Sequence, residues 1–164
     1  MAYVQDAIFF SAFGKNQEEC GFEVSYTYIS HLEKKHLASF FLLLSKSNKY
    51  LPSSELYEQA YADYASQENL KKFFCISENN SVIATGSLHV YIRPQGGKFG
   101  IIEDVIVDES FRKRGIGNAL MKLLLEEARK LNLLKISLVS SVKGQSLYEG
   151  LNFKKREDYY ELNL

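Results

Sequence analysis

One long amphipathic segment between two apolar runs constrains this chain more than any other feature. From residue 115 to 131, apolar side chains recur every three or four positions, and charged side chains take the opposite face. The runs at 99–107 and 135–139 are rich in Ile and Val and predict strands. Two strands that a helix separates pair in parallel, because the chain must cross back between them. The sequence therefore predicts a β-α-β unit.

The remaining patterns predict a mixed α and β domain around this unit. The expected elements are a strand at 22–29, a helix after a capping box at Ser30–Glu33, a helix that opens at Pro52, strands at 72–77 and 82–92, a short helix at 143–151, and a terminal strand or pair from Phe153 onward. Turn residues at 78–81 and 93–98 fold the region 71–107 into an antiparallel meander. Residues 4–13 could form another strand.

Length and charge limit the functional classes. A chain of 164 residues fits one domain, 1–164, in which we expect 1–21 to be an N-terminal extension of uncertain structure. The 20 basic and 20 acidic residues cancel, which argues against charge-driven binding of nucleic acid. Without a signal-peptide pattern or a membrane-length apolar run, a cytoplasmic protein without a membrane partner is expected.

Cysteine and histidine usage predicts no metal site. The two cysteines, Cys20 and Cys75, are far apart, and no Cys-x-x-Cys pair or histidine cluster occurs. Cys75 lies in an apolar strand pattern, so we expect a small core residue rather than a nucleophile. His31 and His36 are predicted at surface positions of a helix.

The stretch ESFRKRGIGNALM at 109–121 combines three cations, at 112–114, with Gly115, Gly117 and the start of the long helix. The first amides of a helix lack partners and carry a partial positive charge, which attracts anions. Glycine lets a ligand approach the backbone closely. This combination predicts a phosphate or diphosphate site.

Three interpretations of this stretch compete with a solvated helix start. A P-loop requires Gly-x-x-x-x-Gly-Lys-Ser/Thr, which is absent. A dinucleotide fingerprint requires Gly or Ala where Leu120 stands, and an acid near the end of the next strand. The third interpretation is coenzyme A, bound through its pyrophosphate.

Two motifs support coenzyme A together. The first is Arg112-Lys-Arg-Gly115-Ile-Gly117, preceded by the strand segment Val105-Ile-Val107-Asp108, and the second is Leu147-Tyr-Glu-Gly-Leu-Asn-Phe153. In their order and spacing they resemble the GNAT superfamily of acetyl-coenzyme A-dependent N-acetyltransferases. The chain departs from the family at Ser141, where Asn is frequent, and at Asn152, where Gly is usual.

The resemblance implies an α+β, three-layer GNAT fold with a mixed, mostly antiparallel sheet of six to seven strands and about four helices. It implies acetyl-CoA as co-substrate and no metal. Backbone groups of Val105, Ile106 and Val107 would pair with the pantetheine arm. The remaining coenzyme contacts implied are Arg112, the amides of Lys113, Arg114, Gly115, Ile116, Gly117 and Asn118, and Ser141.

Tyr148 matches the tyrosine that protonates the leaving thiolate in the family, although a core position between Leu147 and Leu151 is the alternative. Glu103 and Asp104 are two carboxylates inside an apolar strand, which is costly without a role. Strand alternation predicts that they face opposite sides. Glu103 is the general-base candidate, or else it forms a structural salt bridge with a Lys or Arg.

Asp104 and His89 are candidates for substrate binding, and a simple hydrogen-bonding role is the alternative for His89. The segment Ile102-Glu-Asp104 also resembles glucosamine-6-phosphate N-acetyltransferases. We therefore expect direct acetyl transfer to a small primary amine, for which an amino sugar is one candidate. A protein or peptide acetyltransferase and a non-catalytic acyl-CoA-binding module are the alternatives, and a homodimer is one option for assembly.

Overall fold

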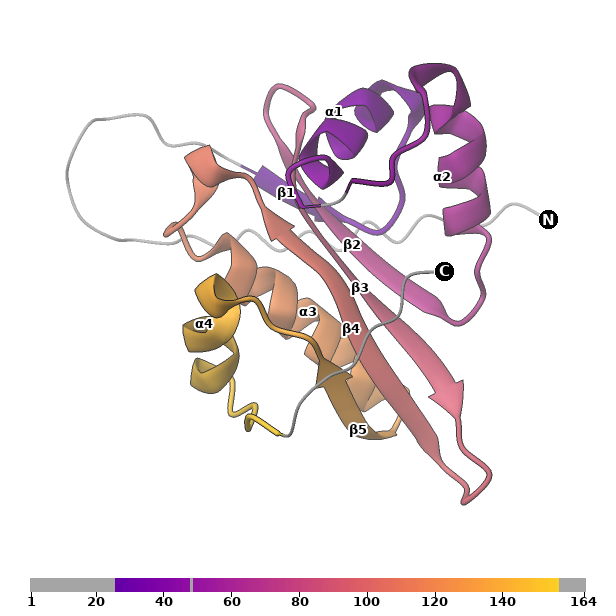
Figure 1. Ribbon diagram of the computed structural model, residues 1–164, viewed down its shortest axis with the longest axis vertical. Coiled ribbons are helices and arrows are strands. Elements are labelled where there is room, and N and C mark those ends of the chain that lie inside the picture. The colour runs from indigo at the N-terminus through magenta and orange to yellow at the C-terminus, as the bar shows by residue number, and fades with distance from the viewer. Residues whose placement is uncertain (1–25, 48, 157–164) are drawn as a thin grey trace.

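The computed structural model describes residues 26–47 and 49–156 (Figure 1). In chain order, its strands and helices are β1 Tyr26–Ile29, α1 Lys34–Leu44, α2 Tyr57–Ala65, β2 Leu70–Ser77, β3 Val82–Ile92, β4 Lys98–Val107, α3 Ile116–Lys130, β5 Leu133–Leu138 and α4 Gln145–Gly150. Short 3₁₀ turns at Ser54–Leu56, Glu109–Phe111 and Val142–Gly144 precede α2, α3 and α4.

The described strands form one five-stranded sheet in the order β1-β2-β3-β4-β5. The first four pair antiparallel, and β4 pairs with β5 in parallel, which confirms the predicted meander and β-α-β unit. We expected six to seven strands. The strands predicted at 4–13 and near the C-terminus fall wholly or largely outside the described residues, and 153–156 are irregular.

Helices cover both faces of the sheet, which gives three layers (Figure 1). On one face, α1 and α2 bury an aromatic cluster that includes Phe40, Tyr61 and Phe74. On the other face, the apolar side of α3 packs against β3 and β4, with Leu120 and Leu124 fully buried. Cys75 is fully buried between the layers, as predicted.

The start of α1 differs from the prediction. We expected a capping box at Ser30–Glu33, but the N-cap is Glu33, and its carboxylate pairs with the backbone of His36. The His36 ring in turn accepts a hydrogen bond at Nδ1 from the Glu33 amide, 3.1 Å away. His36 is buried, so its predicted position on the surface is wrong. Burial lowers the pKa of its imidazole.

The packing of α3 on the sheet predicts a clear contrast between two leucines. Leu120 is fully buried, whereas Leu134 is 69% exposed. Leu120→Ala removes buried methyl groups and leaves a cavity, so we expect a loss of about 2–5 kcal/mol in the free energy of unfolding. Leu134→Ala should change it by about 0.5 kcal/mol or less. Urea denaturation of both variants measures this, and equal effects would contradict the packing.

Candidate active site

The sheet opens where β4 leaves β5. Their parallel pairing ends at Ile102 and Leu138, but β4 continues to Val107. From residue 103 to 107, β4 is hydrogen-bonded to β3 alone among the described strands. One side of this half-strand therefore presents backbone donors and acceptors that no described strand pairs with, and among them the Val107 carbonyl is bonded by Arg112. The others can pair with an extended, amide-containing chain. Val105, Ile106 and Val107, the predicted pantetheine contacts, lie in this segment.

A β-bulge just after the opening reorients Asp104, the second residue of the acidic pair. Ser87 pairs with Glu103 and Thr85 pairs with Ile106, so Asp104 and Val105 together oppose a single residue of β3. Asp104 takes a left-handed backbone conformation with φ of 52°. A bulge of this kind breaks the alternation of side chains. The expectation that Glu103 and Asp104 face opposite sides is therefore wrong.

Both carboxylates reach the face that α1 and α2 cover. Asp104 lines a cavity beneath these helices. Glu103 lies next to Ile102, which packs in the opposite layer with α3, and its Oε2 is 3.3 Å from Nε2 of His89. The polar partner of Glu103 is thus a histidine, in place of the Lys or Arg that we considered. Because both side chains are partly exposed, the pair adds little stability but can exchange protons with solvent.

The cavity at Asp104, here called the Asp104 cavity, has a volume of about 150 Å³. It is lined by Phe40, Phe41, Leu44, Ala60, Tyr61, Tyr64, Thr85 and Asp104. Solvent reaches Asp104, but the surrounding protein raises the pKa of its carboxyl group by burial, and the charge of Glu103 raises it further. Burial also raises the pKa of Tyr64. The cavity is therefore apolar, with a carboxylate at its opening.

The loop before α3 presents backbone amides. Lys113 and Gly115 take left-handed conformations, with φ of 61° and 78°. Gly115 is the N-cap and supplies no capping side chain, so the first amides of α3 lack partners within the helix. A Cβ at Gly115 would meet no atom within 4 Å, which leaves open space over the backbone. These features fit a bound diphosphate.

Two of the three cations of the loop, Arg112 and Arg114, have different surroundings. The guanidinium of Arg112 donates to the Val107 carbonyl and to Glu109, at 3.2 and 2.8 Å. Arg114 lies over the Phe111 ring, 5.4 Å from its centre. Arg112 therefore holds the turn between β4 and the loop, which makes it a structural group as well as a candidate coenzyme contact.

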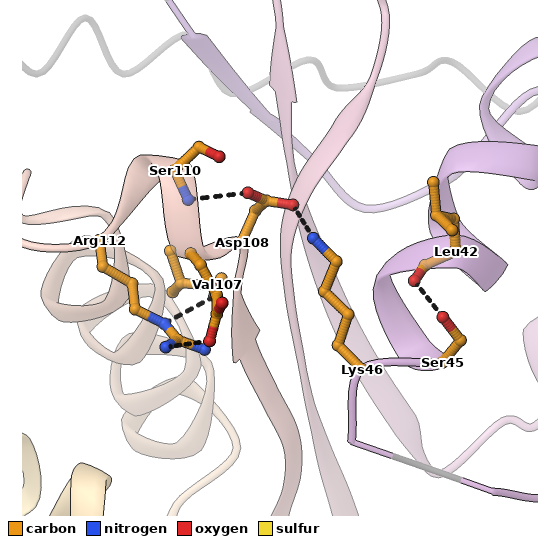
Figure 2. Close-up of polar contacts among 8 residues, drawn as sticks. Leu42, Ser45, Lys46, Val107, Asp108, Ser110 and Arg112 are labelled. Atoms are coloured by element: carbon orange, nitrogen blue, oxygen red, sulfur yellow. Dashed lines mark hydrogen bonds and ion pairs between the residues drawn. The ribbon is translucent and has the colours of Figure 1, made fainter.

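A contact that the sequence does not predict ties the end of α1 to this loop. Lys46, after the end of α1, binds Asp108 Oδ2, while Asp108 Oδ1 accepts a hydrogen bond from the Ser110 amide at 2.9 Å (Figure 2). The hydrogen bond from Lys46 lowers the pKa of the Asp108 carboxyl group. No local pattern predicts a pair 62 residues apart.

Tyr148 lies on α4, on the α3 side of the sheet. Its ring packs against Phe153 and fills the space beside Gly144, where a Cβ would lie 2.9 Å from the tyrosine ring. No group among the described residues hydrogen-bonds its hydroxyl. Burial raises the pKa of Tyr148, so the phenol is protonated at neutral pH and can donate a proton. Ser141 lies in the exposed turn before α4.

Within residues 26–47 and 49–156, no group of three or more His, Cys, Asp or Glu side chains could hold a metal ion. None of the helices in this part of the chain is long and apolar enough to cross a membrane.

Comparison with known proteins decides the family. A model of the acetyltransferase (GNAT) family matches residues 34–153. The chain belongs to this family. It is 33% identical over 136 residues to a glucosamine 6-phosphate N-acetyltransferase of Trypanosoma brucei brucei, a match that spans 81% of this chain and 92% of that protein. This member of the GNAT family is thus an N-acetyltransferase.

Solved structures agree with the fold. A Trypanosoma brucei acetyltransferase is 29% identical to this GNAT chain, with a TM-score of 0.76 over 85% of this chain and all of that one. The Arabidopsis thaliana glucosamine-6-phosphate N-acetyltransferase gives a TM-score of 0.73 at 20% identity, over 85% and 98% of the two chains. The GNAT fold expected from the motifs is confirmed.

The contact between Lys46 and Asp108 predicts a pH-dependent contribution to stability. Because the folded-state pKa of Asp108 is depressed, this contribution is present above its unfolded pKa of about 4 and is lost as pH falls through the folded value. Lys46→Met should lower the melting temperature at pH 7. The loss in the free energy of unfolding should be no more than about 1 kcal/mol, since solvent reaches both groups.

The gap in melting temperature between the wild type and Lys46→Met should shrink when the pH is brought below 4. The matched control is Lys34→Met, which removes a far more exposed pair with Glu58 and should have a smaller effect. A gap for Lys46→Met that is constant from pH 7 to pH 3 would show that Asp108 is not its partner.

Proposed function

We propose that this N-acetyltransferase moves the acetyl group of acetyl-CoA to the primary amine of an amino sugar, with glucosamine 6-phosphate as the first candidate. The observation that carries the proposal is the acidic pair at the β4 bulge, placed between a free strand edge and the Asp104 cavity. The relatives named as glucosamine 6-phosphate N-acetyltransferases support this choice of acceptor.

Acetyl-CoA supplies an activated thioester. The unpaired edge of β4 at Val105, Ile106 and Val107 suits the amides of its pantetheine arm. The amides from Lys113 to Asn118, with Arg112 and the other loop cations, suit its pyrophosphate. Ser141 lies in the turn that follows β5, on the far side of the opening. These contacts direct the thioester toward the bulge, where the carboxylates lie.

The amine must lose a proton to attack the thioester carbonyl. In our proposal, Asp104 binds the ammonium group at the mouth of the cavity. Glu103 accepts the proton, directly or through water, and His89 passes it to solvent across the 3.3 Å contact. His89 thereby becomes a proton carrier in addition to a candidate substrate contact.

As the new C–N bond forms, the C–S bond breaks and leaves a thiolate. Tyr148 is the proposed donor of a proton to this sulfur. Its half-buried position, its protonated phenol and the lack of a hydrogen-bond partner among the described residues support this role. Direct transfer without an acyl-enzyme is proposed, because the described cysteine, Cys75, is fully buried and burial raises its thiol pKa to about 12.

The proposal is tested by following release of free coenzyme A thiol from acetyl-CoA with amino sugars, polyamines, amino acids and peptides. Turnover should be highest with glucosamine 6-phosphate. Glu103→Gln and Tyr148→Phe should each lower kcat about 100-fold or more, since each removes a proton-transfer group. Asp104→Asn should mainly raise KM for the amine.

The outcomes separate the alternatives. Turnover with peptides but not with amino sugars would favour a protein acetyltransferase. Calorimetric binding of acetyl-CoA without turnover of any amine would favour a non-catalytic coenzyme-binding module. If Glu103→Gln and Tyr148→Phe keep wild-type kcat, then these residues do not transfer protons in the reaction.

A further inference from the structure

Thr85 on β3 carries an unsatisfied hydroxyl. The residue is 1% exposed, and its Oγ1 is the one buried side-chain polar atom in the described residues without a hydrogen-bond partner. It pairs with Ile106 across the strands, next to the bulge that holds Asp104. Thr85 and Asp104 both line the Asp104 cavity, so the unsatisfied hydroxyl borders this hollow rather than packed core.

A buried hydroxyl without a partner destabilises a fold by about 1–3 kcal/mol. Valine has nearly the same shape and lacks this cost, and the apolar neighbours of Thr85 would suit it. The threonine is therefore unfavourable for stability in the protein alone. A ligand that hydrogen-bonds Oγ1 within the cavity would remove the cost.

The walls of the cavity indicate what kind of ligand fits. Apart from Thr85 and Asp104, they are apolar or aromatic, with the rings of Phe40, Phe41, Tyr61 and Tyr64. Aromatic rings pack well against the C–H face of a sugar ring, but they offer few hydrogen-bonding partners to the hydroxyl groups of that sugar. The amine and hydroxyl groups of a ligand in the cavity therefore find their polar partners at Thr85 and Asp104.

We propose that the Thr85 hydroxyl is a specificity determinant, which binds a hydroxyl group adjacent to the acceptor amine while Asp104 binds the amine itself. This inference rests on the proposed function and narrows it, because the acceptor is then a vicinal amino alcohol. The Thr85 hydroxyl can both donate and accept a hydrogen bond, so it can pair with a substrate hydroxyl as the donor or as the acceptor. An acceptor without this hydroxyl leaves Oγ1 unpaired.

The test compares enzyme variants and acceptors in a cycle. The acceptors are glucosamine 6-phosphate and its 1-deoxy and 3-deoxy analogues, each of which lacks one hydroxyl next to the amine. The variants are Thr85→Val, which removes the hydroxyl, and Thr85→Ser, which keeps it. Thr27→Val is the matched control, since Thr27 is exposed on β1 and lies outside the Asp104 cavity.

The wild type should prefer glucosamine 6-phosphate over one of the two deoxy analogues by about tenfold or more in kcat/KM. Thr85→Val should lose most of this preference, chiefly through a higher KM for the hydroxylated acceptor, whereas Thr85→Ser and Thr27→Val should keep it. The melting temperature of Thr85→Val without ligand should equal or exceed that of the wild type. That result would show that the loss of preference in Thr85→Val does not come from a destabilised fold.

Three results would overturn the inference. If the wild type turns over amino sugars but Thr85→Val keeps the full preference between acceptors, Thr85 does not determine specificity, although the proposed function stands. If no amino sugar is acetylated, the proposed function and the inference fail together. A lower melting temperature for Thr85→Val would show that its hydroxyl has a structural partner instead.

Discussion

The site depends on one constraint, the point at which β4 parts from β5. Parallel pairing stops at Ile102 and Leu138, and β4 goes on for five more residues with a free edge. The bulge at Asp104 begins within two residues of that point and turns the Asp104 side chain toward α1 and α2, the face on which Glu103 already lies. The same half-strand therefore carries an open backbone edge on one side and two acidic side chains on the face that α1 and α2 cover.

The two faces of the sheet hold this geometry from opposite sides. On one face, α3 packs so closely on β3 that a Cβ at Gly86, opposite the bulge, would lie 3.2 Å from atoms of both Leu120 and Leu124. On the other face, α1 and α2 form the walls of the Asp104 cavity. The link between Lys46 and Asp108 joins the end of α1 to the loop before α3, so the helices that line the Asp104 cavity are in direct contact with this loop (Figure 2).

Much of this architecture could be predicted from sequence, because periodicity and turn residues act locally. The helix at 115–131 and the hairpin strands at 82–92 and 99–107 are found within about one residue of their expected bounds. The bulge could not be predicted, since it depends on the register between β3 and β4. For the same reason the faces of Glu103 and Asp104 were assigned wrongly. The roles of Thr85 and Lys46 required knowledge of burial and of contacts between distant segments.

The most direct test of the account is hydrogen–deuterium exchange with and without coenzyme A. If the free edge of β4 and the start of α3 hold the coenzyme, amides at 103–107 and 113–119 should exchange more slowly when it is bound. Peptides from β2, which lies two strands away, should be unchanged. Slower exchange confined to the α3 loop, with none at 103–107, would contradict the claim that the open half of β4 is the coenzyme-binding edge.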